Sequence, residues 1–412
     1  MENKNVPSIR FKGFIDDWEQ RKLGSVGKTQ SGVGFPDSEQ GGNEGIPFFK
    51  VSDMNNKGNE NEMVTANNYV SEEQVKRKKW KPLETVPAVI FAKVGAAIML
   101  NRKRIIRSPF LFDNNTMAYI FDDSWNVEFG KTLFETINLP KYAQIGALPS
   151  YNSSDIESIE VTVPDKIEQI KIGYLFKQLD KTIALHEREL ELLNLTKKGF
   201  LQQLFTNNSQ LFPNIRFSDF QEEWKQHRLE NVAKFSKGKG YTKNDLVQYG
   251  FKIILYGRMY TKYETIIESI DTYVENNDDC IFSFKDDVIM PSSGESSLDI
   301  VRASVVPYAG IILGGDINII ELDKKIMNPI FIALSISNGT LKKEISNLAQ
   351  GNSVVHLYNS ELKKVNVQSP VIQEQEIISN FFKQLDKIIT LREKELENLK
   401  NVKSAFLQKI FV

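Results

Sequence analysis

The sequence is poor in the residues from which most catalytic and metal centres are built. It has one cysteine, Cys280, and three histidines among 412 residues. A single cysteine excludes a disulfide framework and fits a reducing cytoplasm, and this set is too small for an ordinary zinc site. No apolar run approaches the roughly 20 residues that a membrane-spanning helix needs. These absences predict a cytoplasmic protein that binds no metal.

Motifs of nucleotide-dependent and transferase chemistry are also missing. Gly24–Thr29 (GSVGKT) resembles a phosphate-binding loop, but that motif requires glycine where Lys22 stands. The sequence has no Asn/Asp-Pro-Pro-aromatic tetrapeptide of an amino-methyltransferase and no nuclease-like cluster of acidic residues. We therefore predict no catalytic residues and no cofactor in this chain.

What the sequence does contain is a tandem duplication with an offset of 206 residues. Ile9–Leu23 (IRFKGFIDDWEQRKL) returns as Ile215–Leu229 (IRFSDFQEEWKQHRL), and Phe176–Phe205 returns as Phe382–Phe411 with 18 of 30 positions identical. Both ends of one unit therefore recur. This predicts a first domain at residues 1–165, a central repeated helix at 166–205, a linker at 206–214, a second domain at 215–370 and a C-terminal repeated helix at 371–412.

Both repeated helices carry an apolar seam with alternating steps of three and four residues. Such a seam is typical of a coiled coil, and each copy is the obvious partner of the other. The residues predicted to pair are Phe176, Leu179, Ile183, Leu190, Leu193 and Phe200 in the first helix and Phe382, Leu385, Ile389, Leu396, Leu399 and Phe406 in the second. Two seam positions are polar in both copies, His186 with Arg392 and Lys197 with Lys403. Either these residues are solvated, or they set the register of the two helices or contact another protein.

The segments between the repeated ends are mixed in character. Short apolar runs bounded by Gly, Pro and Asn, such as Ala88–Phe91 and Ala96–Leu100, predict strands, and Glu128–Thr136 predicts a helix. The interior segments of the two copies align poorly. The copies therefore share their leading motif and long helix, while their globular segments have become different surfaces. Trp18 and Trp224 are predicted to anchor the leading motif of each copy on its own domain.

The connectivity of the copies predicts their geometry. The first helix leaves the first domain and leads into the second, so the second helix must run back along it to bury its seam. The predicted fold class is therefore α+β, with two pseudo-twofold-related mixed α/β domains joined by an antiparallel coiled coil. A coiled coil with 29 residues in each helix would span roughly 43 Å. Adjacent major-groove faces on one side of a DNA duplex recur about every 34 Å.

One local charge asymmetry stands out in a chain whose formal net charge is −1. Lys76–Arg107 contains ten basic residues and one acidic residue, Glu84. A solvated face is the usual interpretation of such a run. Basic residues among strands are also what a surface that faces phosphates requires, and the run itself does not decide between the two.

The two-copy layout resembles the specificity subunit of type I restriction–modification systems. The resemblance rests on Ile9–Leu23 with Ile215–Leu229, on the repeated helices and on Ile46–Met54 (IPFFKVSDM), and it covers essentially the whole chain. It implies two target-recognition domains, each reading half of a bipartite double-stranded DNA site. It also implies helices that set the spacer and dock two modification subunits, which supply DNA methylation with S-adenosylmethionine. Restriction subunits that use ATP and Mg would complete the complex.

Base-contacting residues cannot be transferred by motif, so the candidates rest on side-chain chemistry. Arg and Lys read guanine edges, and Asn, Gln and Ser contact adenine or phosphate. The candidates are Lys50, Lys79, Arg102, Lys103, Arg104 and Asn114 in the first domain and Lys237, Lys239, Lys243, Arg258, Lys262, Arg302 and His356 in the second. For each of these residues, an exposed side chain that serves only solubility is an equal alternative. Two alternative functions stay open: a scaffold whose two heads bind proteins, and a nuclease with an unrecognised site.

Overall fold

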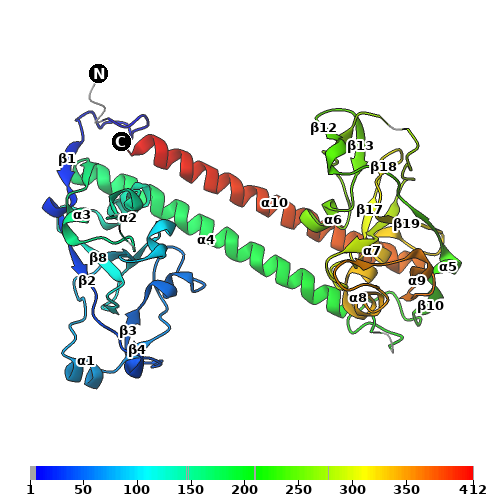
Figure 1. The fold of residues 1–412 in the computed structure, drawn as a ribbon, viewed down its shortest axis with the longest axis horizontal. Helices are drawn as coiled ribbons and strands as arrows, with labels where there is room; N and C mark the ends of the chain where they lie inside the picture. Colours follow the sequence, from blue (N-terminus) through cyan, green and yellow to red (C-terminus); the bar gives the residue numbers. More distant parts are fainter. Residues whose placement is uncertain (1–5, 145, 147, 208–209, 277, 412) are drawn as a thin grey trace. The chain divides into compact units, whose positions relative to one another are not determined.

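The computed structural model describes residues 6–144, 146, 148–207, 210–276 and 278–411. The chain divides into two compact units, a first unit of residues 1–187 and 394–412 and a second unit of residues 188–393. Each unit holds one globular domain and parts of the two longest helices, α4 (Lys166–Gln203) and α10 (Ile372–Ile410), which are green and red in Figure 1. The mixture of helices and largely antiparallel sheets confirms the predicted α+β fold class.

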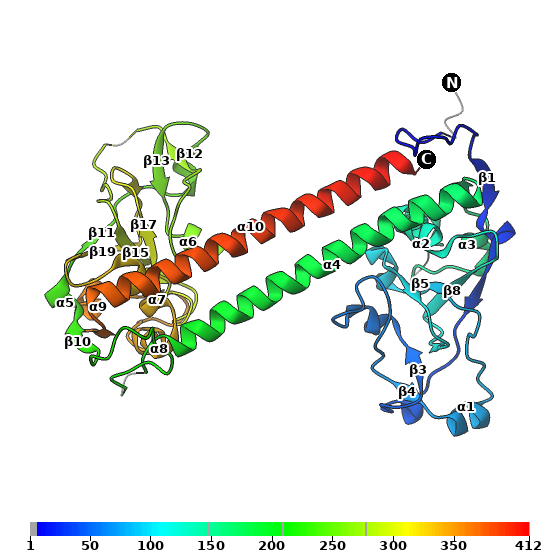
Figure 2. The same ribbon diagram turned by 180° about the vertical axis from the view of Figure 1, so that it is seen from behind.

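The described part of the first unit's domain contains a main sheet, a smaller sheet and the strand pair β1-β9. Its elements are β1 (Glu19–Lys22), β2 (Gly27–Ser31), β3 (Ile46–Phe49), β4 (Tyr69–Val70), α1 (Glu72–Lys78), β5 (Ala88–Ala92), β6 (Lys103–Ile106), β7 (Leu111–Phe112), β8 (Thr116–Phe121), α2 (Val127–Thr136), α3 (Ser153–Glu157) and β9 (Glu160–Val163). The main sheet has the order β2-β8-β5-β6 and the smaller one β4-β3-β7. Figures 1 and 2 show α1, β3 and β4 at the end of this domain that lies away from α4.

The main sheet of the first unit is covered on both faces, which explains the continuous apolar run of β5. Side chains alternate along a strand, and Val89 and Phe91 lie in the core that includes Phe129 of α2. Ala88 and Ile90 lie in a separate core on the other face. A strand between two cores has no solvent-facing side, so it carries no alternating polar residues.

The domain of the second unit also contains two main sheets, with the orders β11-β19-β15-β17 and β12-β14-β13-β18, and a short pair, β16-β20. Its strands are β10 (Lys225–Arg228), β11 (Ala233–Lys237), β12 (Leu246–Val247), β13 (Phe251–Ile254), β14 (Tyr273–Val274), β15 (Asp287–Pro291), β16 (Ser293–Gly294), β17 (Ser304–Val306), β18 (Ile312–Leu313), β19 (Ile317–Leu322), β20 (Val355–His356) and β21 (Asn366–Ser369). Its helices are α5 (Leu229–Val232), α6 (Arg258–Thr261), α7 (Pro329–Ser337), α8 (Gly339–Ser346) and α9 (Asn359–Leu362).

The two domains share a topology that their interior sequences conceal. In chain order, β2, β5, β6 and β8 take the same places in their sheet as β11, β15, β17 and β19. The one parallel pair of each smaller sheet, β3 with β7 and β13 with β18, also corresponds. Burial pattern and connectivity can therefore preserve a fold after the residue identities have diverged.

The leading motif of each copy closes its own domain. β1 pairs antiparallel with β9, and β10 pairs in the same way with β21. Trp18 and Trp224, directly before β1 and β10, are 1% and 2% exposed. Both tryptophans therefore lie inside the cores of their own domains.

Each domain also packs the end of the long helix that belongs to the other copy. In the first unit, the ring of Phe411 lies 6.3 Å from that of Trp18 and 5.8 Å from that of Phe176. In the second unit, Phe205 lies 6.4 Å from Trp224 and 6.1 Å from Phe382. These aromatic contacts bury the ends of both helices.

Within each unit the two long helices run antiparallel. Of the residues predicted to pair, Phe176, Ile183, Phe382, Leu385, Ile389 and Leu396 are buried, and Leu179, Leu190, Leu193, Phe200, Leu399 and Phe406 are half-buried. Three polar seam residues form ion pairs between the helices: Lys403 with Asp180 (2.7 Å) in the first unit, and Lys197 with Asp386 (2.5 Å) and Arg392 with Glu189 (3.3 Å) in the second. The fourth, His186, lies 4.0 Å from a carboxylate oxygen of Glu395 across the helices. These pairs tie the helices in one register.

The strand predicted at Ala96–Leu100 is wrong, because this segment forms a 3-10 helix. Gly95 before it and Asn101 after it both have positive φ, of 86° and 51°. The amide N of Ile98 donates to the carbonyl O of Gly95, and that of Asn101 donates to the carbonyl O of Ile98. Left-handed residues at both ends favour a short turn over a strand, despite the apolar composition.

A buried carboxylate in the second unit gives a pH-dependent prediction. Asp287 of β15 is 2% exposed and accepts a 2.7 Å hydrogen bond from the amide of Phe284, and burial raises its pKa to about 6. Its contribution to stability is therefore greatest below the unfolded pKa and is lost as the pH rises through about 6. We expect Asp287→Asn to stabilise the second unit by about 1–2 kcal/mol at pH 8, with a gain that shrinks toward pH 4. Hydrogen exchange of the β15 amides measures this; a gain that grows on acidification would contradict it.

Candidate nucleic-acid interface

The two domains share a glycine-centred loop that follows the first strand of each main sheet. A Cβ on Gly32, after β2, would lie 2.0 Å from the carbonyl O of Asp113. A Cβ on Gly238, which lies 206 residues later and after β11, would lie 2.1 Å from that of Gly314. Only glycine allows this close approach. The loop backbone is therefore pressed against the turn before β8 or β19 in both domains.

In the first unit this loop region brings together two of the predicted DNA-binding residues. The amide of Asp113 donates to the carbonyl O of Phe49 (3.0 Å), so Lys50 and Asn114, the next residues along each segment, flank the same contact. Asn114 is exposed, and the half-buried Lys50 donates from Nζ to Oε1 of Gln40 (3.1 Å).

In the second unit the same loop carries Lys237 and Lys239. Lys237 lies 3.5 Å from a carboxylate oxygen of Asp316, and Lys239 lies 2.5 Å from one of Asp279. Both lysine side chains remain more than half exposed. Lys243 follows in an exposed 3-10 turn. Predicted contact residues therefore lie near the glycine loop in both domains, on the loop itself in the second domain and on the neighbouring segments after β3 and β7 in the first.

The basic run of the first domain is divided between surface and interior. Lys79 ends α1 in a left-handed conformation and is exposed, as are Lys76 and Lys81. Arg77 and Lys78 of the same helix instead pair with the carboxylate of Glu39, at 2.6 and 3.2 Å.

The other candidates of this run are committed to their own domain. Lys103 donates from Nζ to the carbonyl O of Ile137 (2.7 Å), and burial lowers its pKa to about 8. Arg104 donates from Nε to the carbonyl O of Asn59 (2.6 Å), and burial lowers its pKa too. Arg102 bonds to the side chain of Asn55. These contacts favour a structural role for the three cations.

Arg258 of the second domain is similarly engaged. Its side chain is 9% exposed and pairs with Glu264 at 2.7 Å and with Asp271 at 2.9 Å. Lys262 lies 3.8 Å from Glu264 and is half exposed. Arg258 therefore holds the loop after α6 together, whereas Lys262 stays at the surface.

The last two candidates lie beside aromatic rings. Arg302 pairs with Asp299 at 2.7 Å and lies 5.5 Å from the ring centre of Tyr260. His356 of β20 is half-buried and stacks on Tyr358 with ring centres 6.2 Å apart. Arginine over an aromatic ring and a stacked imidazole are compatible with nucleic-acid contact and with ordinary packing.

Several structurally important residues were missed by sequence reasoning. The most prominent are Lys131 and Glu135 of α2, which join Asp180 and Lys403 in a mostly buried ion network. The repeated FKQLDK segment, which contains Asp180, was a visible signal. The glycine loops Ser31–Phe35 (SGVGF) and Lys237–Tyr241 (KGKGY) were another, since they match at the same 206-residue offset.

The part of the chain that the structure describes shows no group of three or more His, Cys, Asp or Glu side chains arranged to hold a metal ion. Among the same residues, no helix has both the length and the apolar character needed to cross a membrane.

The sequence matches a family model for the type I restriction modification DNA specificity domain twice, at residues 15–195 and 221–401. These matches cover most of the chain, and the chain belongs to this family. The two matched segments follow the duplication.

Two relatives have low sequence identity to this chain. The chain is 21% identical over 272 residues to the type I restriction enzyme MjaVIII specificity subunit of Methanocaldococcus jannaschii. This match covers 63% of each protein. The chain is also 21% identical over 287 residues to the putative MjaX specificity subunit of the same organism, over 66% of this chain and 64% of the relative. The chain thus spans somewhat less than two thirds of these relatives.

Solved structures share the fold. The crystal structure of the type I restriction–modification S subunit from M. genitalium matches with a TM-score of 0.65 and 14% identity, over 99% of both chains. A structure that describes complex assembly and conformational transition of a type I restriction–modification system matches with a TM-score of 0.54 and 13% identity, over 95% of this chain and 97% of the other.

Proposed function

We propose that this protein is the DNA specificity subunit of a type I restriction–modification complex. Each domain reads one half of a bipartite, asymmetric double-stranded DNA target, and the chain itself catalyses nothing. The observation that carries this proposal is the match of both copies to the specificity-domain family. The shared strand order supports it, because two domains of one fold and different surfaces suit two different half-sites.

The long helices are proposed to have two tasks. They hold the domains at the separation that sets the DNA spacer, and they dock two modification subunits. S-adenosylmethionine would be bound by those subunits, and ATP and Mg by restriction subunits that join the same complex. The proposed setting is the cytoplasm, where the complex would have access to DNA.

Mapping of N6-methyladenine across the genome tests this function, in cells that contain the modification subunit with or without this chain. We expect methylation of one split, asymmetric motif that disappears with the chain. DNA binding by the purified complex provides the second measurement. A complex that neither methylates nor binds DNA would contradict the proposal.

The exposed lysines around α1 give a quantitative prediction. Replacing Lys76, Lys79 and Lys81 with Gln should weaken binding to all DNA sequences alike and reduce the salt slope by up to about 3, since each phosphate contact contributes roughly 0.9. Titrations of the complex at several salt concentrations measure both effects. Exposed Lys225, Lys234 and Lys325 of the second unit, changed in the same way, serve as the control. A loss confined to one target sequence would mean that the α1 lysines read bases.

A further inference from the structure

The two domains contact the long helices through equivalent helices of different chemistry. The backbone N–H of Asn126, which caps α2, donates to Oε1 of Gln169 (2.8 Å), and that of Asn328, which caps α7, donates to Oε1 of Gln375 (2.8 Å). Aligned from these caps, α2 (VEFGKTLFET) carries Glu, Lys and Glu where α7 (PIFIALSIS) carries Ile, Ala and Ser. α7 contains no charged residue.

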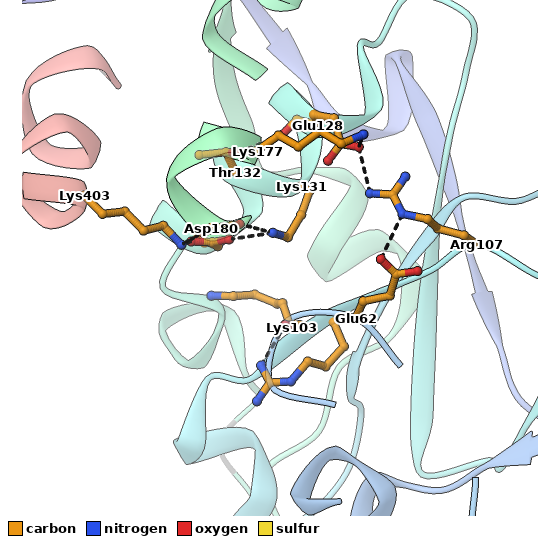
Figure 3. A network of polar contacts seen from close by, with 11 residues as sticks. Glu62, Lys103, Arg107, Glu128, Lys131, Thr132, Lys177, Asp180 and Lys403 are labelled. Atoms are coloured by element: carbon orange, nitrogen blue, oxygen red, sulfur yellow. Dashed lines mark hydrogen bonds and ion pairs between the residues drawn. The ribbon is translucent and has the colours of Figure 1, made fainter. Parts of the chain in front are cut away.

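In the first unit the charged residues of α2 meet both long helices (Figure 3). Lys131 pairs with Asp180 of α4 and lies 3.6 Å from Glu135. Lys403 of α10 lies 2.7 Å from Asp180 and 2.6 Å from Glu135. The side chains of Lys131, Asp180 and Lys403 are 13%, 14% and 15% exposed. Asp180 therefore links α2, α4 and α10 in a site that is mostly closed to water.

A second, separate set of ion pairs connects α2 to the sheet and to α4. Glu128 of α2 accepts from Lys177 of α4 (2.9 Å) and from Arg107 (2.8 Å), which directly follows β6. Arg107 also pairs with Glu62 at 3.0 Å. A chain of ion pairs thus runs from the edge of the main sheet through α2 to α4.

Among the residues that the structure describes in the second unit, only the helix-to-helix part of this arrangement is present. Asp386 and Lys197, which correspond through the duplication to Asp180 and Lys403, lie 2.5 Å apart. The positions of Lys131 and Glu135 are occupied by Ala333 and by Ser337. Both helices also pack apolar residues against a long helix: Phe331, Ile332 and Leu334 of α7 share a core with Ile378 and Phe382 of α10, and Phe129, Leu133 and Phe134 of α2 share one with Ile172 and Phe176 of α4. The chain itself therefore offers a matched comparison between an apolar attachment with added ion pairs and an apolar attachment without them.

The ion pairs favour the charged forms of Asp180 and Lys403 despite their burial. Burial alone would raise the pKa of Asp180, but Lys131 and Lys403 outweigh it and hold the pKa below the ordinary value. Burial likewise lowers the pKa of Lys403, and Glu135 with Asp180 more than offset this. The groups therefore stay charged at neutral pH, where removal of one partner would leave an uncompensated buried charge.

We propose that Asp180 and Lys131 are positioning residues that fix the orientation of the first domain on the long helices, so that they control which spacer length the complex accepts. This inference rests on the proposed function as a DNA specificity subunit. The second domain, attached through apolar contacts at the equivalent place, does not depend on such a pair.

The test compares three variants in the full-length chain, alone and in complex with the modification subunits. Asp180→Asn weakens the anchor, Asp386→Asn weakens only the helix pair of the second unit, and Lys131→Ala with Glu135→Ser gives α2 the residues of α7 while the Asp180–Lys403 pair remains. Hydrogen exchange of α2 and α7 reports the attachment of each domain. Affinity for DNA duplexes with the native spacer and with one additional base pair reports spacer selectivity.

We expect α2 amides to exchange at least tenfold faster in Asp180→Asn and in the Lys131/Glu135 variant, and α7 amides to change less than twofold in Asp386→Asn. The preference for the native spacer should fall at least fivefold in Asp180→Asn and in the Lys131/Glu135 variant and stay within twofold in Asp386→Asn, with unchanged half-site bases. Equal effects of Asp180→Asn and Asp386→Asn, or an unaffected Lys131/Glu135 variant, would overturn the inference. If the unaltered complex did not bind DNA, the proposed function would fail, while hydrogen exchange would still test the anchor.

Discussion

Deletion of one heptad from each long helix, Leu185–Glu191 together with Leu391–Glu397, is expected to shorten the preferred DNA spacer by about one to three base pairs. Seven residues correspond to about 10.5 Å of helix, or about three base pairs at 3.4 Å each. Three base pairs also turn the duplex by about 100°, since one turn takes 10–10.5 base pairs. Because the domains must still face their half-sites, this rotation favours the smaller changes.

The deletion preserves most of the pairing between the helices; the exception is Lys400, which loses its partner Glu187. Each deletion removes seven residues, so the apolar seam keeps its heptad phase in both helices. The two deleted segments are equivalent, because they lie 206 residues apart. They contain both partners of the Arg392–Glu189 pair and of the His186–Glu395 pair, so no partner of either pair is left behind. Methylation mapping or selection from a spacer library measures the outcome. A shorter spacer with the same half-site bases is expected, and an unchanged spacer would refute the idea that the helices set it.

Replacing Glu168 with Ala is expected to destabilise the first unit by about 3–5 kcal/mol. Glu168 is fully buried and accepts two hydrogen bonds of 2.8 Å from Arg10 and one of 3.2 Å from Nε1 of Trp18. Its loss would leave a mostly buried guanidinium and a buried indole N–H without their acceptor. Buried donors without partners carry the full cost of their desolvation.

The second copy provides the control for this prediction. Glu374 accepts two hydrogen bonds from Arg216, of 2.8 and 2.7 Å, in the same arrangement. Among the described residues, however, Nε1 of Trp224 has no hydrogen-bond partner. Glu374→Ala should therefore cost about 1 kcal/mol less than Glu168→Ala. Hydrogen exchange of β1 with β9 and of β10 with β21 measures each unit separately; a larger loss in the second unit would contradict the prediction.

The sequence predicted the frame of the molecule well because the frame is repetitive. The seam residues recur at regular steps, and local periodicity specifies a helix and its buried face. The strand at Ala88–Phe91 was equally visible, because it is a short apolar run bounded by turns. The run at Ala96–Leu100 was misleading, since its composition is apolar while left-handed backbone at Gly95 and Asn101 determines the conformation.

The candidate interface was less predictable for a physical reason. The sequence does not distinguish a lysine or arginine that faces solvent from one that bonds to an internal carbonyl. Lys79 is exposed, whereas Lys103 of the same basic run bonds to Ile137 and is half-buried. The difference depends on contacts between residues 34 positions apart, which no local pattern contains.

By itself, the sequence determined the duplication, the two long helices with their seams, the α+β class and the family, since all of these depend on order and periodicity along the chain. Only the tertiary structure decided that the divergent interiors share one strand order, that lysine and arginine at the polar seam positions form ion pairs between the helices, and that the first domain adds ion pairs to the apolar packing that both domains use. These properties depend on which distant side chains meet and how well water is excluded there, because burial sets both the strength of an ion pair and the cost of an unpaired group.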